Sequence, residues 1–330
     1  MTFSVCFIER RDQESPSIER VFRSIANELE TGGVSVRFVK VPFGNGSIGT
    51  LLNLLCFRPP TSDLYHVTGH VNYVCLRLPR KKTILTVHDM TVLGLRSGLR
   101  RWLIRKLFFV WPVRSVNFLT AISQATKERI VQETGIAPES VQVIENPLLV
   151  SESPAHGFNA DEPTILQVGT APNKNIPRLI EAITGMRCKL RIVGRIPISL
   201  RHRIDELEIK LTNDDRLDDA GMERAYEDSD IVAFCSTEEG FGLPIIEAQA
   251  KRTVVVTSDR SPMKEVAGGG AVLVDPDDVD SIRQGIKMVV QDASLRTKLV
   301  ETGSANIGRF DPANIAAKYM NLYERALEKL

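Results

Sequence analysis

Short apolar runs of strand length alternate with amphipathic helical patterns along the whole chain. In the first half, the strand-like runs lie near residues 3–8, 34–41, 64–68, 83–88, 116–121 and 141–144. Helical patterns lie near residues 16–30, 47–57, 98–111 and 124–134. The runs at 34–41 and 84–87 are rich in β-branched residues, which suits buried parallel strands. This alternation predicts right-handed βαβ crossovers and a doubly wound parallel sheet.

The second half repeats the alternation. Its strand-like runs lie near residues 164–168, 188–193, 231–235, 253–257 and 271–274. Its helical patterns lie near residues 175–184, 198–210, 219–228, 244–252, 278–291 and 294–303. A last helix is expected at about 313–329, because Asp311 can cap it and Pro312 suits its first position.

Residues 146–163 separate the two halves, and their prolines, small polar residues and weak periodicity predict a linker. We therefore expect domains at 1–150 and 151–312, with the terminal helix of about 313–330 packing back on the first. The expected fold class is α/β, with two doubly wound parallel-sheet (Rossmann-like) domains facing a cleft. Such sheets bind ligands at the carboxyl ends of their strands, so this cleft is the expected active site.

The composition is that of an average soluble globular protein, with 43% hydrophobic and 25% charged residues, which excludes a disordered, fibrous or disulfide-rich chain. The five cysteines show no CxxC spacing, so buried free thiols are expected. We find neither a signal-peptide pattern nor an apolar stretch of about 18 residues. The expected protein is therefore cytoplasmic and does not span a membrane.

The net charge of +1 hides a difference between the halves. Residues 1–150 hold 19 Lys and Arg against 12 Asp and Glu (+7), and residues 151–330 hold 23 against 29 (−6). The basic half favours an anionic partner, such as a phosphorylated lipid, an anionic glycan or a membrane surface, although solvated surface charge explains it equally well. Nucleic acid is not expected, because the basic residues are not interleaved with aromatic residues on a recognised module.

The segment STEEGFGLPIIEA at 236–248 directly follows the strand-like run at 231–235. Gly240 and Gly242 allow a tight loop that approaches a ligand closely, and Pro244 suits the first position of the next helix. Loop amides and a helix N-terminus can bind a diphosphate or a sugar oxygen. Glu239 before the helix and Glu247 in its expected first turn can accept hydrogen bonds from a vicinal diol. Taken singly, either glutamate is explained as well by solvation or by the helix dipole.

Glu239 and Glu247 are separated by seven residues around Gly-Phe-Gly-Leu-Pro. This pattern resembles the E-x7-E motif of retaining GT-B glycosyltransferases, family 4 in particular. Other segments resemble that family in order and spacing: LQVGTAPNKN at 166–175, LRIVG at 190–194, TSDRSPMKEVA at 257–267, VLVDP at 272–276, LTVHDM at 85–90, TAISQ at 120–124 and VIENP at 143–147. The resemblance implies GT-B architecture and transfer of a sugar, with retention, from a nucleotide-diphosphate sugar to a glycan or lipid-linked acceptor.

The resemblance also implies roles for single residues. Lys174 would neutralise the donor diphosphate, Glu247 would hold the ribose, and Glu239 would hold the transferred sugar. The implied donor-binding set is Gly169, Thr170, Lys174, Arg195, Gly240, Phe241, Gly242, Leu243 and Glu247. The implied catalytic residues are Glu239, His88 and Asp89, and the acceptor-side residues are Gly69 and His70. A structural histidine is an equally good interpretation of His88, and His66 is expected to line the cleft beside His70.

The chain also departs from the family pattern. Thr170 and Asn173 stand where many members carry an arginine, so Arg195 is the candidate replacement for this positive charge. No cofactor is expected, because the nucleotide sugar is a substrate, and no metal is expected. The acidic clusters at 214–219 and 275–278 are interpreted as solvated loops that cap helices. Two alternatives stay open: a non-catalytic nucleotide-sugar-binding protein, and an epimerase on the same fold.

Residues 96–111 combine five positive charges with four large aromatic side chains, and Pro112 is expected to end this helix. Helical spacing predicts that Leu99, Trp102, Leu103, Leu107 and Val110 face the core. Ile104, Phe108 and Trp111 then lie on a neighbouring face. Such a helix can lie on an anionic membrane, although an ordinary domain helix explains it as well.

Overall fold

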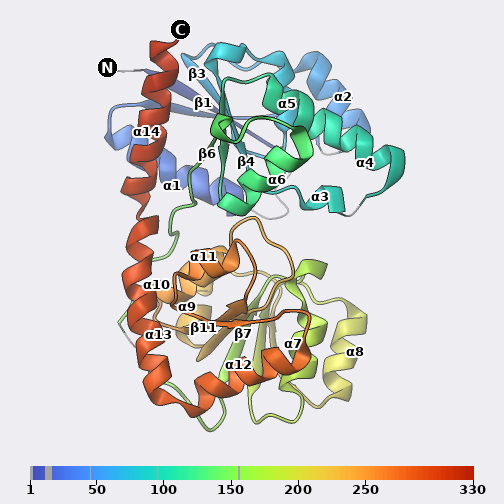
Figure 1. The fold of residues 1–330 in the computed structure, drawn as a ribbon, viewed down its shortest axis with the longest axis vertical. Helices are drawn as coiled ribbons and strands as arrows, with labels where there is room; N and C mark the ends of the chain where they lie inside the picture. Colours follow the sequence, from blue (N-terminus) through green and yellow to red (C-terminus); the bar gives the residue numbers. More distant parts are fainter. Residues whose placement is uncertain (1–2, 12–16, 45, 95, 155–156) are drawn as a thin grey trace. The chain divides into compact units, whose positions relative to one another are not determined.

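A computed structural model describes residues 3–11, 17–44, 46–94, 96–154 and 157–330. The chain forms two compact units (Figure 1): unit 1 comprises Met1–Leu149 with Phe310–Leu330, and unit 2 comprises Val150–Arg309. The terminal helix α14 (Pro312–Glu328) therefore belongs to unit 1, with Asp311 as its cap. Its Tyr319 and Tyr323 are buried in that unit.

Unit 1 contains a sheet of six parallel strands in the order β2-β1-β3-β4-β5-β6. The strands are β1 (Ser4–Glu9), β2 (Ser35–Lys40), β3 (Leu64–Val67), β4 (Thr83–Val87), β5 (Phe118–Ala121) and β6 (Val141–Val143). Its α-helices are α1 (Ser17–Thr31), α2 (Ser47–Cys56), α3 (Thr91–Gly94), α4 (Gly98–Ile104), α5 (Trp111–Arg114), α6 (Gln124–Thr134) and α14. The expected strands of the first half are confirmed, and helices cover the buried strands β1, β3, β4 and β5. Strand β2 was expected to be buried but is half-exposed, because it lies at the edge of the sheet.

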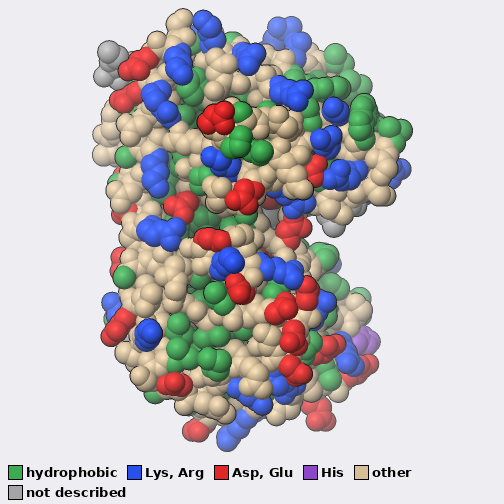
Figure 2. Space-filling view, viewed as in Figure 1, with side chains coloured by type: hydrophobic (Ala, Val, Ile, Leu, Met, Phe, Trp, Pro, Cys, Tyr) green, Lys and Arg blue, Asp and Glu red, His purple; other side chains and the backbone are tan. Residues whose placement is uncertain are grey.

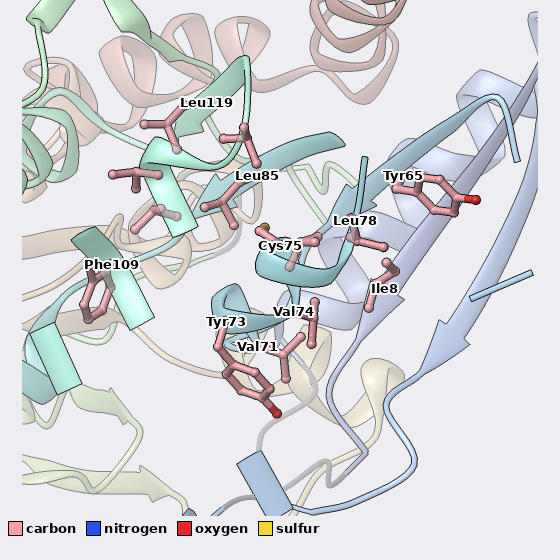
Figure 3. Close-up of a cluster of buried hydrophobic side chains, with 14 of the residues drawn as sticks. Ile8, Tyr65, Val71, Tyr73, Val74, Cys75, Leu78, Leu85, Phe109 and Leu119 are labelled. Carbon is pink, nitrogen blue, oxygen red and sulfur yellow. The ribbon is translucent and has the colours of Figure 1, made fainter. Parts of the chain in front are cut away.

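The core of unit 1 lies between the sheet and the segments packed on it. Figure 3 shows Tyr73, Val74 and Cys75 of the 3-10 turn Asn72–Arg77 among side chains from β1, β3 and β4, including Ile8 and Leu85. The sequence pattern did not predict this turn, because its apolar residues follow neither a helical nor a strand period. Four of the five cysteines are buried free thiols as expected, whereas Cys56 is exposed.

The helix at 98–114 differs from its prediction. It does not end at Pro112, because α4 continues through a π-helical segment, Arg105–Val110, into α5, which contains Pro112. The backbone N–H of Trp111 donates to the carbonyl of Lys106, five residues earlier. Proline has no N–H to donate, and the wider π-helical turns accommodate it within a continuing helix. A proline near a helix end can therefore be tolerated.

The predicted core-facing stripe of this helix is also wrong in part. Leu99, Trp102 and Leu103 are exposed, with 72%, 47% and 50% of their surface accessible. The buried residues instead lie further along the helix and include Phe109 and Val110. The change from α to π geometry rotates the later residues relative to the earlier ones, so one 3.6-residue period cannot describe both parts.

Unit 2 contains a second sheet of six parallel strands, in the order β12-β11-β10-β7-β8-β9. The strands are β7 (Thr164–Val168), β8 (Lys189–Val193), β9 (Lys210–Asp214), β10 (Ile231–Phe234), β11 (Val254–Ser258) and β12 (Val272–Val274). Its helices are α7 (Ile176–Ile183), α8 (Ile198–Glu206), α9 (Asp219–Glu227), α10 (Leu243–Ala250), α11 (Met263–Ala267), α12 (Val279–Gln291) and α13 (Ala293–Asn306). The sequence pattern missed β9, an edge strand without fully buried residues, and α11.

The expected linker is fixed to unit 2 through two of its serines, Ser151 and Ser153. Lys251 is buried, and its ammonium contacts Glu223 at 2.5 Å and Glu227 at 3.0 Å. The same ammonium donates to the hydroxyls of Ser151 (3.0 Å) and Ser153 (3.1 Å). Within the described part of 146–163, the backbone forms no helix or strand, so these bonds order an irregular segment.

Both sheets change winding direction once. In unit 2, successive strands run outward from β7 to β9, and β10 then returns to pair with the other edge of β7. In unit 1, β1 lies between β2 and β3. Ligands of doubly wound sheets bind where the winding reverses, beyond the carboxyl ends of the strands. A ligand site is therefore expected at the loops after β7 and β10 in unit 2, and at the loops after β1 and β3 in unit 1.

His66 lies in the core of unit 1 and not on a ligand-accessible surface, which corrects its expected place in a cleft. Its two ring nitrogens form hydrogen bonds of 2.7 Å with Tyr323 and Thr86. Burial lowers the pKa of His66 from 6.5 to about 3, and burial likewise lowers the pKa of His88 to about 3. Both imidazoles are therefore neutral in the folded protein near neutral pH.

The stability of unit 1 should fall as the pH drops below the ordinary histidine pKa of 6.5. The unfolded chain then binds protons that the buried rings cannot accept. The free energy of unfolding should decrease by roughly 1.4 kcal/mol per pH unit for each of the two rings until their folded pKa is approached. Urea titrations between pH 7 and pH 5 measure this slope.

The variant His66→Asn should be less stable at pH 7. The part of the pH dependence of its unfolding free energy that comes from the buried histidines should be about half that of the wild type, since one of the two rings is removed. His202→Gln is the matched control, because His202 is an exposed residue of α8 in unit 2. An equal change of the unfolding free energy with pH in wild type and His66→Asn would contradict the assignment of His66 as a buried, neutral histidine.

Candidate active site

The loops after β7 and β10 meet at the switch point of unit 2. Lys174 follows β7 and Glu239 follows β10, and the distance from Lys174 Nζ to Glu239 Oε1 is 2.6 Å. Both side chains are mostly covered, with 18% and 13% of their surface exposed. The same ammonium lies 4.6 Å from the ring centre of Phe234, the last residue of β10. A positive and a negative group therefore lie together where this fold binds ligands.

Two asparagines hold these loops, and the sequence analysis assigned a role to neither. Asn173 donates from Nδ2 to the carbonyl of Glu238 (2.8 Å) and to Oε1 of Glu239 (3.2 Å). Asn175 is buried in the left-handed region (φ 58°), and its Nδ2 donates to the carbonyls of Cys235 and Pro276. The sequence signal was the repeated asparagine around Lys174, because asparagine favours turns and tolerates left-handed geometry.

Gly169 and Thr170 lie beside Lys174. Gly169 has φ 84°, and a Cβ placed on it would stand 3.0 Å from Cε of Lys174. Gly194, after the neighbouring strand β8, has φ 129°, and a Cβ there would meet Cγ2 of Thr170 at 3.1 Å. Glycine at both positions leaves room for the two side chains that flank the loop.

Arg195 extends from the loop after β8 into solvent. Within the described ranges, it forms no ion pair. It therefore remains available as the additional positive charge that the sequence analysis expected near the diphosphate. The structure places it just after β8, the strand next to β7, but it does not bring Arg195 into contact with Lys174.

The segment 240–247 forms a loop and a helix. Gly242 is the N-cap of α10 with φ 116°, Phe241 is buried, and Leu243 is the first helical residue. Pro244 is therefore at the second helical position and not the first. Glu247 lies in the second turn and not in the first as expected. Its Oε2 accepts a 2.6 Å hydrogen bond from the hydroxyl of Tyr226, which is fully buried.

A second cluster lies at the carboxyl ends of β3 and β4 in unit 1. His88 Nε2 donates to the carbonyl of Thr68 at 2.7 Å, since a carbonyl can only accept. His70 Nε2 lies 3.6 Å from Oδ2 of Asp89, and the two histidine rings lie 5.9 Å apart. Burial raises the pKa of Asp89, but the neighbouring His70 and the hydrogen bonds from Thr91 outweigh it, so this pKa lies below its ordinary value.

Gly69 is required by close packing at the switch point of unit 1. A Cβ on Gly69 would stand 2.9 Å from the backbone nitrogen of Arg10, just beyond β1. The structure therefore brings together the four expected residues of unit 1: His88, Asp89, Gly69 and His70. Whether this cluster contacts an acceptor remains a prediction.

The acidic clusters have structural roles. Asp218 caps α9 and Asp278 caps α12, as expected. Asp214 pairs with Arg191 at 2.8 Å, and Asp277 pairs with Arg260. Across the part of the chain that the structure describes, no group of three or more His, Cys, Asp or Glu side chains could hold a metal ion.

Two family models match the chain. Residues 151–305 match the model for glycosyl transferases group 1, and residues 56–150 match the model for Glycosyltransferase Family 4. The matches meet at the boundary between the two units and include both clusters. The chain belongs to the family 4 glycosyltransferases.

Two curated relatives indicate the chemistry found in this family. The O-antigen chain mannosyltransferase RfbU of Salmonella typhimurium is 29% identical over 236 residues, which cover 68% of this chain and 66% of that protein. A phosphatidyl-myo-inositol mannosyltransferase of Mycobacterium tuberculosis is 30% identical over 183 residues, which cover 51% of this chain and 48% of that protein. The matched parts thus span 66% and 48% of these two relatives.

A solved structure supports the fold. HepE of Anabaena, in complex with UDP and glucose, aligns with a TM-score of 0.73 at 18% identity, over 98% of this chain and 100% of that chain. At this identity the likeness concerns the fold alone. Two parallel six-stranded sheets and this likeness confirm the GT-B fold class.

The ion pair between Lys174 and Glu239 leads to opposite expectations for its two members. Lys174→Ala should weaken the binding of a nucleoside diphosphate by roughly 1.5–3 kcal/mol, the range for hydrogen bonds to charged groups. Glu239→Gln should leave that affinity unchanged or raise it, because the neutral amide no longer competes for the ammonium. Isothermal titration calorimetry measures both, and equal losses in the two variants would refute the separation of roles.

Tyr226→Phe should weaken nucleotide binding although Tyr226 is buried, because its hydroxyl fixes the carboxylate of Glu247. We expect a loss of affinity of about 1 kcal/mol, the scale of one hydrogen bond, because the carboxylate must then be ordered when the ribose binds. Tyr323→Phe is the matched control, since it removes a buried tyrosine hydrogen bond in unit 1. The control should lower stability without changing nucleotide affinity, and similar affinities in wild type and Tyr226→Phe would show that Glu247 does not need this bond.

Proposed function

We propose that the chain transfers a sugar, with retention and without a metal ion, from a nucleotide-diphosphate sugar to a glycan or lipid-linked acceptor. The observation that carries the proposal is the Lys174–Glu239 ion pair at the switch point of unit 2, in a chain of this family. A mannosyl donor is the first candidate, because both relatives are named mannosyltransferases.

In the proposed donor site, the ammonium of Lys174 binds the diphosphate, whose negative charge increases as the sugar–phosphate bond breaks. Loop amides at Gly240–Gly242 and the N-terminus of α10 stabilise the same charge. Glu247, positioned by Tyr226, accepts hydrogen bonds from the ribose hydroxyls. Once the diphosphate has replaced Glu239 as the partner of Lys174, the carboxylate of Glu239 binds the transferred sugar.

Retention requires that the acceptor oxygen attack from the face that the phosphate leaves. In this scheme a phosphate oxygen takes the acceptor's proton, so that no protein base is needed at that face. His88 is neutral and donates from Nε2 to Thr68, so its Nδ1 is the nitrogen that can accept a hydrogen bond from a sugar hydroxyl. Asp89 and His70 supply further polar groups on the acceptor side. The cleft expected between the two domains stays a prediction.

We also propose a peripheral contact between unit 1 and an anionic membrane, through the basic helix at 96–114. The structure shows which positive charges of this helix are available for the membrane contact. Arg101 and Arg105 both pair with Glu133 of α6, at 2.5 Å and 3.0 Å, so they contribute less than expected. Arg96 and Arg100 are exposed and keep their charge for an anionic partner. No helix of the described residues is long and apolar enough to cross a bilayer.

The proposal is tested by screening nucleotide sugars for a rise in melting temperature and then measuring transfer to glycan and lipid-linked acceptors. We expect a bound donor, a product with the anomeric configuration of the donor by nuclear magnetic resonance, and full activity after exhaustive chelation. Glu239→Ala should abolish transfer while leaving the melting temperature of the free protein nearly unchanged.

Three results would contradict parts of this proposal. Turnover of a nucleotide sugar to its epimer without acceptor would indicate an epimerase. Donor binding without transfer or hydrolysis would indicate a binding protein. An activity lost on chelation and restored by a divalent ion would exclude the metal-independent mechanism.

A further inference from the structure

Helix α2 exposes its apolar face and buries its polar one. Its buried residues are Thr50 and Asn53, whereas Ile48, Leu51 and Leu55 are 77%, 56% and 60% exposed. The orientation is fixed, because Asn53 accepts from the amide of Phe43 and donates to its carbonyl and to the hydroxyl of Tyr73. A helix arranged in this way presents apolar area that water solvates poorly.

The helix at 98–114 provides a second exposed apolar surface beside α2. Helix α4 has no buried residue, and Trp111 at the start of α5 is 49% exposed. A groove of about 720 Å³ lies between the two helices, within unit 1, in the size range of small-molecule sites. Its lining residues are Gly46, Ser47, Thr50, Leu51, Leu54, Arg96, Arg100, Leu103, Ile104, Leu107, Phe108 and Trp111. Figure 2 shows hydrophobic and basic side chains side by side over this part of unit 1.

The charges of the groove have one sign. Arg96 and Arg100 line it, and its lining contains no acidic residue. The neighbouring Arg101 and Arg105 pair with Glu133 instead. The groove therefore combines a long apolar wall with two cationic groups at its edge, which is the complement of an amphiphile with an anionic head.

We propose that this groove binds the hydrocarbon chain of an anionic lipid, with the phosphate of the head group at Arg96 and Arg100. The inference deepens the membrane contact proposed above and rests on it. A second copy of the chain fits less well, because a symmetric contact would bring the arginines of both copies together. Docking on a bilayer surface alone would need a convex apolar face on the protein, whereas a groove can hold a single inserted hydrocarbon chain.

The position of the groove relates it to the acceptor side. Arg96 follows Asp89 by seven residues, so their Cα atoms are at most about 25 Å apart. In this proposal, a lipid held in the groove by its chain carries its head group toward the edge of the sheet where His88, Asp89 and His70 cluster. The groove would then select lipid-linked acceptors over free glycans.

The chain's two tryptophans report directly on this groove. They are Trp102 and Trp111, of which only Trp111 lines the groove. In the variant Trp102→Phe, lauroyl-lysophosphatidylglycerol below its micelle concentration should shift the emission of Trp111 to shorter wavelength and should saturate. Glycerol phosphate, which lacks the chain, should not shift it, and the zwitterionic lauroyl-lysophosphatidylcholine should bind more weakly.

Matched variants in the Trp102→Phe background distinguish lipid binding in the groove from nonspecific hydrophobic binding. Leu51→Asp should weaken lipid binding about tenfold or more, whereas Leu55→Asp, an equally exposed leucine of α2 outside the groove, should not. Arg100→Glu should weaken binding, and Lys81→Glu, an exposed lysine of unit 1 outside the groove, should have little effect. Circular dichroism confirms that each variant is folded.

Several outcomes would overturn the proposal. These are equal binding by Leu51→Asp and Leu55→Asp, an equal response to glycerol phosphate, or attachment to anionic vesicles without binding of the monomeric lipid. A dimer in sedimentation that Leu51→Asp dissociates would assign the groove to a second copy. The measurement uses no sugar donor, so its failure is distinguishable from failure of the proposed transfer activity.

Discussion

The ion pair between Lys174 and Glu239 joins two loops that lie 65 residues apart in the chain. It forms because β7 and β10 are parallel neighbours, so that their carboxyl ends reach the same edge of the sheet. Asn173 and Asn175 then fix the loops in contact, and Gly169 leaves the space that the lysine stem occupies. The other residues expected at the donor site depend on this arrangement, since the glycine loop and α10 continue directly from Glu239. In the proposed mechanism, the diphosphate takes Lys174 from its present partner, and this exchange couples binding of the diphosphate to release of the glutamate.

Much of this organisation could be predicted from the sequence. Buried parallel strands such as β10 are continuous apolar runs, and their alternation with helices fixes the fold class. The E-x7-E spacing placed Glu239 and Glu247 on one strand–loop–helix segment. The roles of Asn173, Asn175 and Tyr226 could not be predicted, because each acts through a contact between segments that are distant in sequence. The edge strand β9 was missed because an edge strand with charged, half-exposed residues has no apolar pattern to detect.

The greatest departure from the sequence pattern lies in unit 1. Helical periodicity predicted that Leu99, Trp102 and Leu103 would face the core, but the π-helical segment before Pro112 changes the register and leaves them exposed. Helix α2 likewise leaves apolar residues exposed, because hydrogen bonds of Asn53 hold its polar face inward. Periodicity identifies the apolar face of a helix but not the partner of that face. These two neighbouring helices combine exposed apolar residues with arginines that face solvent. A ligand that is both apolar and anionic would complement both features.

The account's central claim is that unit 2 binds the nucleotide at the β7–β10 switch point. A crystal structure of the chain with a nucleoside diphosphate sugar tests it most directly. We expect a diphosphate oxygen within hydrogen-bond distance of Lys174 Nζ, the ribose hydroxyls at Glu247, and the ion pair between Lys174 and Glu239 opened. A nucleotide bound away from both residues, with that ion pair intact, would contradict the account.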